Sequence, residues 1–205
     1  MIIQQIKPST FLEKEQNESN LGHRGIGIGF GSINTKHLQT TKINDITTIF
    51  ENIASISEEI NVVIQIFDAK NILNHKHLYY AVYFALRSLN NGTNISKNEA
   101  VEYLLYASQQ RQINVAIDLL GLKIDWTKEK IEVAYVLVGN DENSINEAFN
   151  RLNDLLQFKD ESPILNLDKI EKLRDTYNIN NFELSNALKI MNVSNSEREE
   201  KLTRD

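Results

Sequence analysis

The stretches NVVIQIF at residues 61–67 and IEVAYVLV at residues 131–138 decide the fold. Both are short, continuous and rich in β-branched residues, which predicts two buried strands. Apolar residues between them recur at helical spacing and predict three amphipathic helices, at 75–90, 96–107 and 111–120. Two strands separated by three helices fit neither a simple hairpin nor a regular βαβαβ alternation. The sequence therefore predicts an α+β fold, with a small mixed or antiparallel sheet surrounded by about seven helices.

Further elements are expected on both sides of this segment. Residues 1–6 and 23–32 predict two more strands. Additional helices are predicted at 43–57, 143–156, 167–177 and 182–191. Ser96 and Glu99 have the spacing of a capping box, which predicts that a helix begins at Ser96. The expected organisation is one main domain at 1–158, a helical extension packed on it at 159–191, and a polar tail at 192–205.

The composition excludes several kinds of chemistry. None of the 205 residues is Cys, which excludes disulfides, thiolate metal sites and a Cys nucleophile. His75 and His77 are two positions apart, so on a helix they point in different directions and do not share a metal ion. No stretch approaches the roughly 18 apolar residues of a membrane span. Residues 1–10 lack the pattern of a signal peptide. We therefore expect a cytoplasmic protein that uses no metal and no cofactor.

One stretch raises an enzymatic alternative because glycine occupies every second position: Gly25, Gly27, Gly29 and Gly31. In a G-x-G-x-x-G motif the third glycine would fall at Phe30 or Ser32, so the spacing of a dinucleotide-binding loop is not met. We favour a strand whose glycines let a neighbouring element come close. A nucleotide-binding enzyme that uses residues 25–31 remains the alternative.

Charge is distributed unevenly along the chain. The net charge is −6 at pH 7, yet residues 69–123 hold six Lys and Arg against three Asp and Glu. A basic region inside an acidic protein provides an electrostatic footprint for an anion.

This basic region resembles a known family. The matching features are the strand ending in FDA, the A-x-x-x-A helix after it, the connection R-S-x-x-N-G-x-N-I-S, and Y-A-S-x-x-R-Q-I. Together they resemble the kinase-binding subunit of the KEOPS (EKC) complex, the PRPK-binding protein family. The resemblance covers residues 61–139. Gln109 departs from the family pattern, which has Gly at that position.

The resemblance implies a subunit that has no catalytic activity of its own. Such subunits bind and stimulate the small atypical kinase/ATPase of KEOPS, which makes threonylcarbamoyl-adenosine in tRNA. Archaeal relatives also hold the single-stranded 3′ CCA end of the tRNA. The implied partners are therefore that kinase and tRNA, with no membrane and no small-molecule substrate. A scaffold that binds its protein partner but no RNA remains an alternative.

Two sets of residues are candidates for these contacts. For RNA, cations suit phosphates and amides suit an unstacked base. The RNA candidates are Lys70, His77, Arg87, Asn91, Asn94, Lys97, Arg111 and Gln112. A kinase should dock on an exposed apolar patch with a polar rim. The candidates for that patch are Ile145, Phe149, Leu152, Leu173 and Tyr177, for which core packing is the alternative.

Overall fold

The computed structural model describes residues 1–5, 24–41, 43, 45–161 and 167–180. The chain forms two compact units, Met1–Leu165 and Asn166–Asp205. In the second unit, α7 spans Leu167–Thr176. The predicted helix at 182–191 and the tail at 192–205 lie outside the described residues. The predicted packing of the extension at 159–191 stays a prediction. No described helix is long and apolar enough to cross a membrane.

The first unit is built on an antiparallel sheet. Its described strands are β1 (Ile2–Gln5), β2 (Gly25–Asn34), β3 (Val63–Asp68), β4 (Lys130–Gly139) and β5 (Lys159–Asp160). The strand order is β1-β2-β4-β3, and β5 pairs with β2. β4 pairs with β2 along its whole length and with β3 on its other side. β4 is therefore an inner strand, and β3 is an edge strand.

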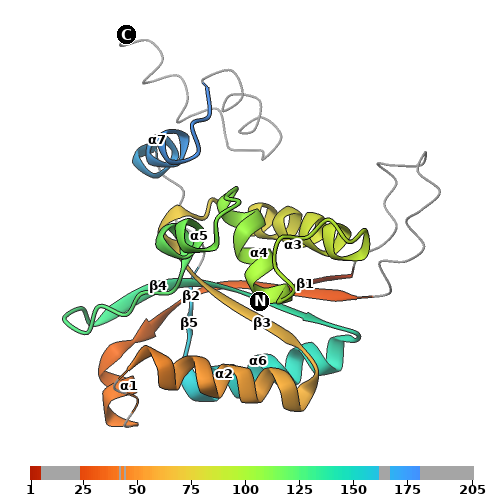
Figure 1. Cartoon of the computed structure of the whole chain (residues 1–205). Coiled ribbons are helices and arrows are strands. Elements are labelled where there is room, and N and C mark those ends of the chain that lie inside the picture. The colour runs from red at the N-terminus through yellow and green to blue at the C-terminus, as the bar shows by residue number, and fades with distance from the viewer. Residues whose placement is uncertain (6–23, 42, 44, 162–166, 181–205) are drawn as a thin grey trace. The chain divides into compact units, whose positions relative to one another are not determined.

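Helices cover both faces of this sheet (Figure 1). One layer consists of α1 (Thr35–Thr40), α2 (Ile46–Ile60) and α6 (Glu142–Leu156). The other consists of α3 (His75–Asn90), α4 (Glu99–Ser108) and α5 (Ile113–Leu120). Successive β4 residues alternate between two hydrophobic cores, with Val136 facing the α3–α5 layer and Leu137 facing the α1, α2 and α6 layer. Burial on both faces explains why this strand is continuously apolar in sequence.

The predicted α+β fold is confirmed, and the sheet is antiparallel rather than mixed. The predicted helix at 75–90 is α3, whose first turn is capped by the side chain of Asn74. The sequence did not predict α1 or β5. Their lengths of 6 and 2 residues are too short for a periodic pattern to develop.

The start of α4 differs from the predicted capping box. Its N-cap is Asn98, whose side-chain oxygen accepts the N–H of Val101 at 3.1 Å, so the helix begins at Glu99. The N–H of Ser96 donates instead to the carboxylate of Glu102, at 2.8 Å. Asn is among the residues that cap helices best, and Asn98 directly precedes Glu99, the first residue of α4.

The glycines of β2 lie on one face of the strand and allow residues of other elements to come close to its backbone. A Cβ at Gly27 would lie 2.8 Å from the side chain of Ile145 in α6, and a Cβ at Gly29 would overlap the ring of Tyr135 in β4. These contacts confirm that the glycines let other elements come close. They also fill the space beside this face of β2 in which the nucleotide-binding alternative for residues 25–31 would place a phosphate.

Gly29→Ala should lower the free energy of unfolding by about 1–3 kcal/mol, because the added methyl group overpacks against the Tyr135 ring. Chemical denaturation measures this change. In a Tyr135→Leu background, where the ring is absent, the cost of Gly29→Ala should largely disappear. An undiminished cost in that background would show that another contact requires the glycine.

Candidate functional site

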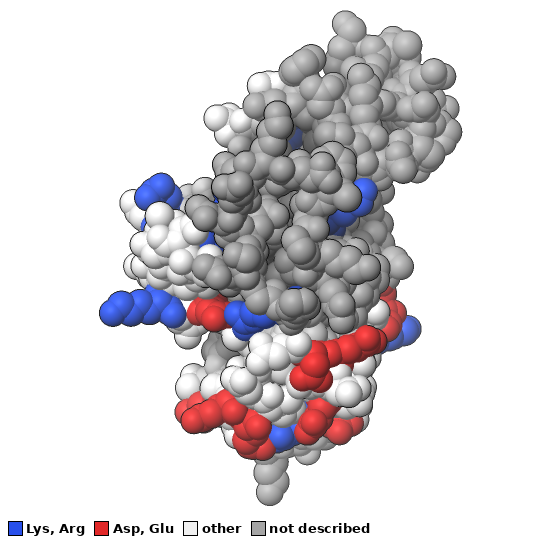
Figure 2. All heavy atoms as spheres, turned by 90° about the vertical axis from the view of Figure 1, so that its right-hand side faces the viewer, with Lys and Arg blue, Asp and Glu red and all other residues white. Residues whose placement is uncertain are grey.

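The sheet separates two helical layers of different charge. The helices α2 and α6 together carry six acidic residues and one basic residue: Glu51, Glu58, Glu59, Glu142, Glu147, Asp154 and Arg151. Residues 69–123, which contain α3, α4 and α5 with their connections, carry six basic and three acidic residues. The excess lies in the connections, since Lys70, Lys97, Arg111 and Lys123 are outside these three helices. In Figure 2 most acidic side chains of the visible face lie in its lower part. A locally basic balance of this kind favours anionic ligands at the connections of the α3–α5 layer.

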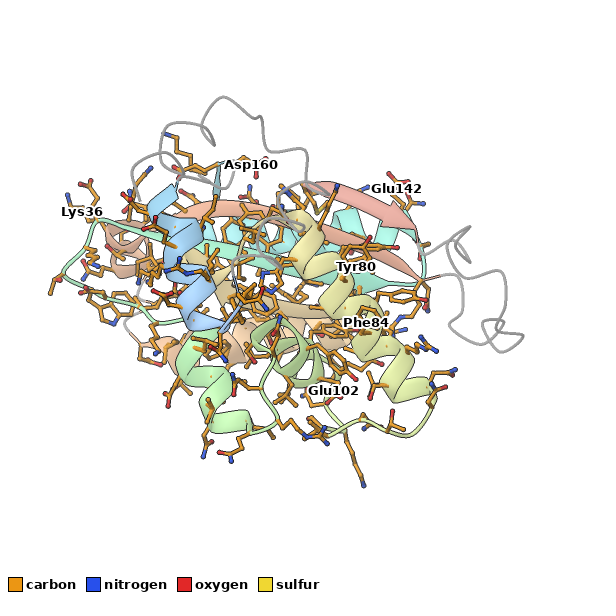
Figure 3. The ribbon with its side chains drawn as sticks, turned by 90° about the horizontal axis from the view of Figure 1, so that it is seen from above. Lys36, Tyr80, Phe84, Glu102, Glu142 and Asp160 are labelled. Atoms are coloured by element: carbon orange, nitrogen blue, oxygen red, sulfur yellow. The ribbon has the colours of Figure 1, made fainter. Side chains whose placement is uncertain are left out.

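A buried carboxylate holds the connection between α3 and α4. Glu102 is 0% exposed, and its carboxylate accepts the N–H of Ile95 at 3.2 Å and of Ser96 at 2.8 Å. The hydroxyl of Ser96 accepts the N–H of Asn98, and the side-chain amide of Asn94 donates to the Ser96 carbonyl. Figure 3 labels Glu102 on α4. Hydrogen bonds to a charged acceptor are stronger than neutral ones, so this connection has a well-defined backbone.

A second polar cluster joins the start of β2 to α4. Arg24 and the hydroxyl of Tyr103 both donate to Oε2 of Glu99, each at 2.8 Å. Burial raises the pKa of Tyr103, and the charge of Glu99 adds to that shift, so the hydroxyl remains a donor. Sequence reasoning missed this cluster because Arg24 and Glu99 are 75 residues apart.

The RNA candidates form two groups at opposite ends of α4. Arg87, Asn91, Asn94 and Lys97 lie at or near the α3–α4 connection, whereas Arg111 and Gln112 lie in the α4–α5 connection. The 10 residues of α4 separate the groups by about 15 Å. Asn91, Lys97, Arg111 and Gln112 are exposed, and Arg87 and Asn94 are half-buried.

Two further RNA candidates already have partners in the fold. Nδ1 of His77 accepts the N–H of Leu73 at 3.2 Å, so Nε2 carries the proton and donates to the Ala107 carbonyl at 2.9 Å. Both ring nitrogens thus join the start of α3 to the end of α4, which contradicts the predicted RNA contact through the His77 ring. Lys70 is exposed but forms an ion pair with Asp68 at 3.1 Å.

Exposed aromatic rings lie along α3. Tyr80 is 56% exposed and Phe84, one turn later, is 45% exposed (Figure 3). They lie edge-on to Tyr79 and Tyr83, with ring centroids 5.5 and 5.4 Å apart. Exposed aromatic rings are the kind of surface on which unpaired bases can stack.

A hollow of about 760 Å³ runs along β3, between α2 on one side and α4 and α5 on the other. We call it the β3 groove. Its main apolar lining residues are Phe50, Ile53, Ala54, Val101, Leu104 and Ile117. Phe50 and Ile117 are 43% and 45% exposed. The acidic lining residues are Glu58 and Glu99, and the lining includes no His, Lys or Arg. This composition suits the binding of a protein segment better than acid–base chemistry.

The candidate kinase patch is partly wrong. Ile145 and Leu152 are 0% exposed because the apolar stripe of α6 packs against the sheet, so no partner reaches these two side chains. Phe149 is half-buried and stacks on Tyr135 at a centroid distance of 5.7 Å.

In the second unit Leu173 is buried and Tyr177 is half-buried. For these two residues and for Phe149, contact with a kinase stays a prediction.

In the part of the chain that the structure describes, no group of three or more His, Asp or Glu side chains is placed to hold a metal ion.

A family model described as "Kinase binding protein CGI-121" matches residues 40–203. The matched range includes the helices and strands that form the β3 groove and both groups of RNA candidates. Among curated proteins the comparison finds no significant match.

Glu102→Gln should lower the free energy of unfolding by about 1–3 kcal/mol, because a neutral amide accepts weaker hydrogen bonds and turns its own donors toward backbone N–H groups. Amide hydrogen exchange should become faster at Ile95 and Ser96. Glu147→Gln, an exposed change on α6, is the matched control and should alter neither rate. Unchanged exchange in Glu102→Gln would mean that the carboxylate does not hold the connection.

Proposed function

The chain belongs to the CGI-121 family of kinase-binding proteins, and on this basis we propose that it is a non-catalytic regulatory subunit of a KEOPS-type complex. In this role it binds the atypical kinase of the complex, stimulates its ATPase activity and helps recruit tRNA for threonylcarbamoyl-adenosine formation. The family match over residues 40–203 is the observation that carries the proposal.

The chemistry of the β3 groove supports a binding role. Its one hydroxyl-bearing lining residue, Ser57, donates to the carbonyl of Val62 at 2.7 Å. No histidine lies beside this hydroxyl among the lining residues, so the groove offers no nucleophile–base pair.

Exposed apolar side chains at the groove supply the surface for the kinase. Phe50 of α2 and Ile117 of α5 line it, and Ile113 is 39% exposed one turn before Ile117. Exposed apolar side chains that lie next to polar ones are typical of protein interfaces. We therefore place the kinase contact on this surface and not on Ile145 and Leu152, which are buried.

The α3–α5 layer supplies the surface for RNA. Lys97 and Arg111 would contact phosphates at the two ends of α4, while Tyr80 and Phe84 would stack unpaired bases. The supporting observations are the exposure of these four side chains and the basic balance of residues 69–123. The single-stranded 3′ end of tRNA is the part whose bases are free to stack.

Ile117→Asp should weaken binding of the kinase by about tenfold or more, since it places a charge in the apolar lining. Isothermal titration calorimetry measures the dissociation constant. Val115→Asp is the matched control, because Val115 is 40% exposed on the same helix but does not line the groove. Equal affinity of both variants and the wild type would remove the groove from the interface.

Replacing Lys97 and Arg111 together by Gln should weaken tRNA binding and reduce the slope of log K against log salt concentration by about 1.4, or about 0.7 for each lost phosphate contact. The control exchanges two exposed lysines elsewhere, Lys36 and Lys128, for Gln. If the affinity and the slope stay at the wild-type values, tRNA does not contact these two residues. If the wild type binds no tRNA, the alternative of a scaffold that binds no RNA is favoured.

A further inference from the structure

We propose that the β3 groove binds an extended segment of the kinase, which adds to the edge of β3 as a further strand. The segment is apolar at successive positions and carries a basic residue beside Glu58. The proposal rests on the proposed function and specifies how the partner is held.

The backbone of β3 has one side available for a new strand. β3 is the last strand in the order β1-β2-β4-β3, and beyond its pairing with β4 it makes one isolated bridge, between Phe67 and Gly121. The side-chain amide of Gln65 donates to the Ile66 carbonyl at 2.7 Å, so this carbonyl points away from β4. Backbone groups alternate in an antiparallel strand, so the N–H and C=O of Ile64 point the same way. An exposed edge of this kind is a template for strand addition.

The walls of the groove fit the side chains of such a strand. α2 and the α4–α5 pair lie on opposite sides of β3 (Figure 1). Successive side chains of an added strand would point alternately to the two walls. One set would contact Phe50 and Ala54 of α2, and the other Val101 and Ile117. All four are apolar, so the residues of the partner that face either wall, which are successive along its strand, are required to be apolar.

Charge identifies one position of the segment as basic. Glu58 lines the groove, is exposed and forms no ion pair among the described residues, whereas Glu99, the other acidic lining residue, is paired with Arg24. The unpaired carboxylate of Glu58 at the rim favours a partner that carries Lys or Arg beside its apolar residues.

The same rim disfavours a second copy of this chain as the occupant. β3 has the sequence VIQIFD, which contains no basic residue. Edge-to-edge pairing of two copies would bring two acidic rims together without a compensating cation.

The test titrates the kinase into the wild type, Glu58→Lys and Asp154→Lys, and then measures amide exchange in the wild-type complex. Glu58→Lys should weaken binding by about tenfold or more, because it reverses the charge at the rim. Asp154→Lys makes the same charge change at an exposed position of α6 outside the groove and should bind like the wild type. In the complex, the Ile64 amide should exchange at least about tenfold more slowly.

The outcomes separate this proposal from the proposed function. A kinase that does not bind the wild type contradicts the function itself. A kinase that binds normally to Glu58→Lys and leaves Ile64 exchange unchanged overturns strand addition while the function stands. Protection of Ile64 that depends on the concentration of this chain alone would identify a second copy as the occupant and overturn the proposal as well.

Discussion

The pairing of β4 with β2 and β3 is the constraint on which the rest of the structure depends. Every residue of β4 from Val133 to Val138 is 0% exposed, and alternate residues enter different cores. Burying each large apolar side chain contributes about 1.5–3 kcal/mol, so the sheet is favourable only when helices cover both faces. This requirement places the acidic helices α2 and α6 on one side and the more basic α3–α5 layer on the other. It also leaves β3 as an edge, because the helices cover faces and not edges.

Close packing across the sheet explains a motif that resembles a nucleotide-binding loop. The glycines of β2 lie where α6 and the ring of Tyr135 approach the strand, so their small size serves packing. The candidate binding features of the chain lie in connections and in one groove. The α3–α4 connection is held by Glu102, and the groove is lined by exposed apolar side chains. Both features suit the recognition of partners by a family of kinase-binding proteins.

The sequence predicted what depends on local pattern. The helix at 75–90 has a cap, an apolar stripe and a stop, and the structure places α3 at those bounds. The sequence could not predict which strands are neighbours, so the edge position of β3 and the groove beside it were missed. It also could not reveal Glu102 as the support of a connection, since a Glu on a helix is usually solvated. The amphipathic pattern of α6 is compatible with packing in the core and with docking of a partner. In the structure Ile145 and Leu152 are buried, so these two residues belong to the core.

The central claim is that this chain acts on a kinase without chemistry of its own. Steady-state ATP hydrolysis by the purified kinase, by this chain, and by an equimolar mixture of the two tests it most directly. The account predicts no turnover by the chain and a rate in the mixture well above that of the kinase alone. Turnover by the isolated chain, or a mixture no faster than the kinase by itself, would contradict it.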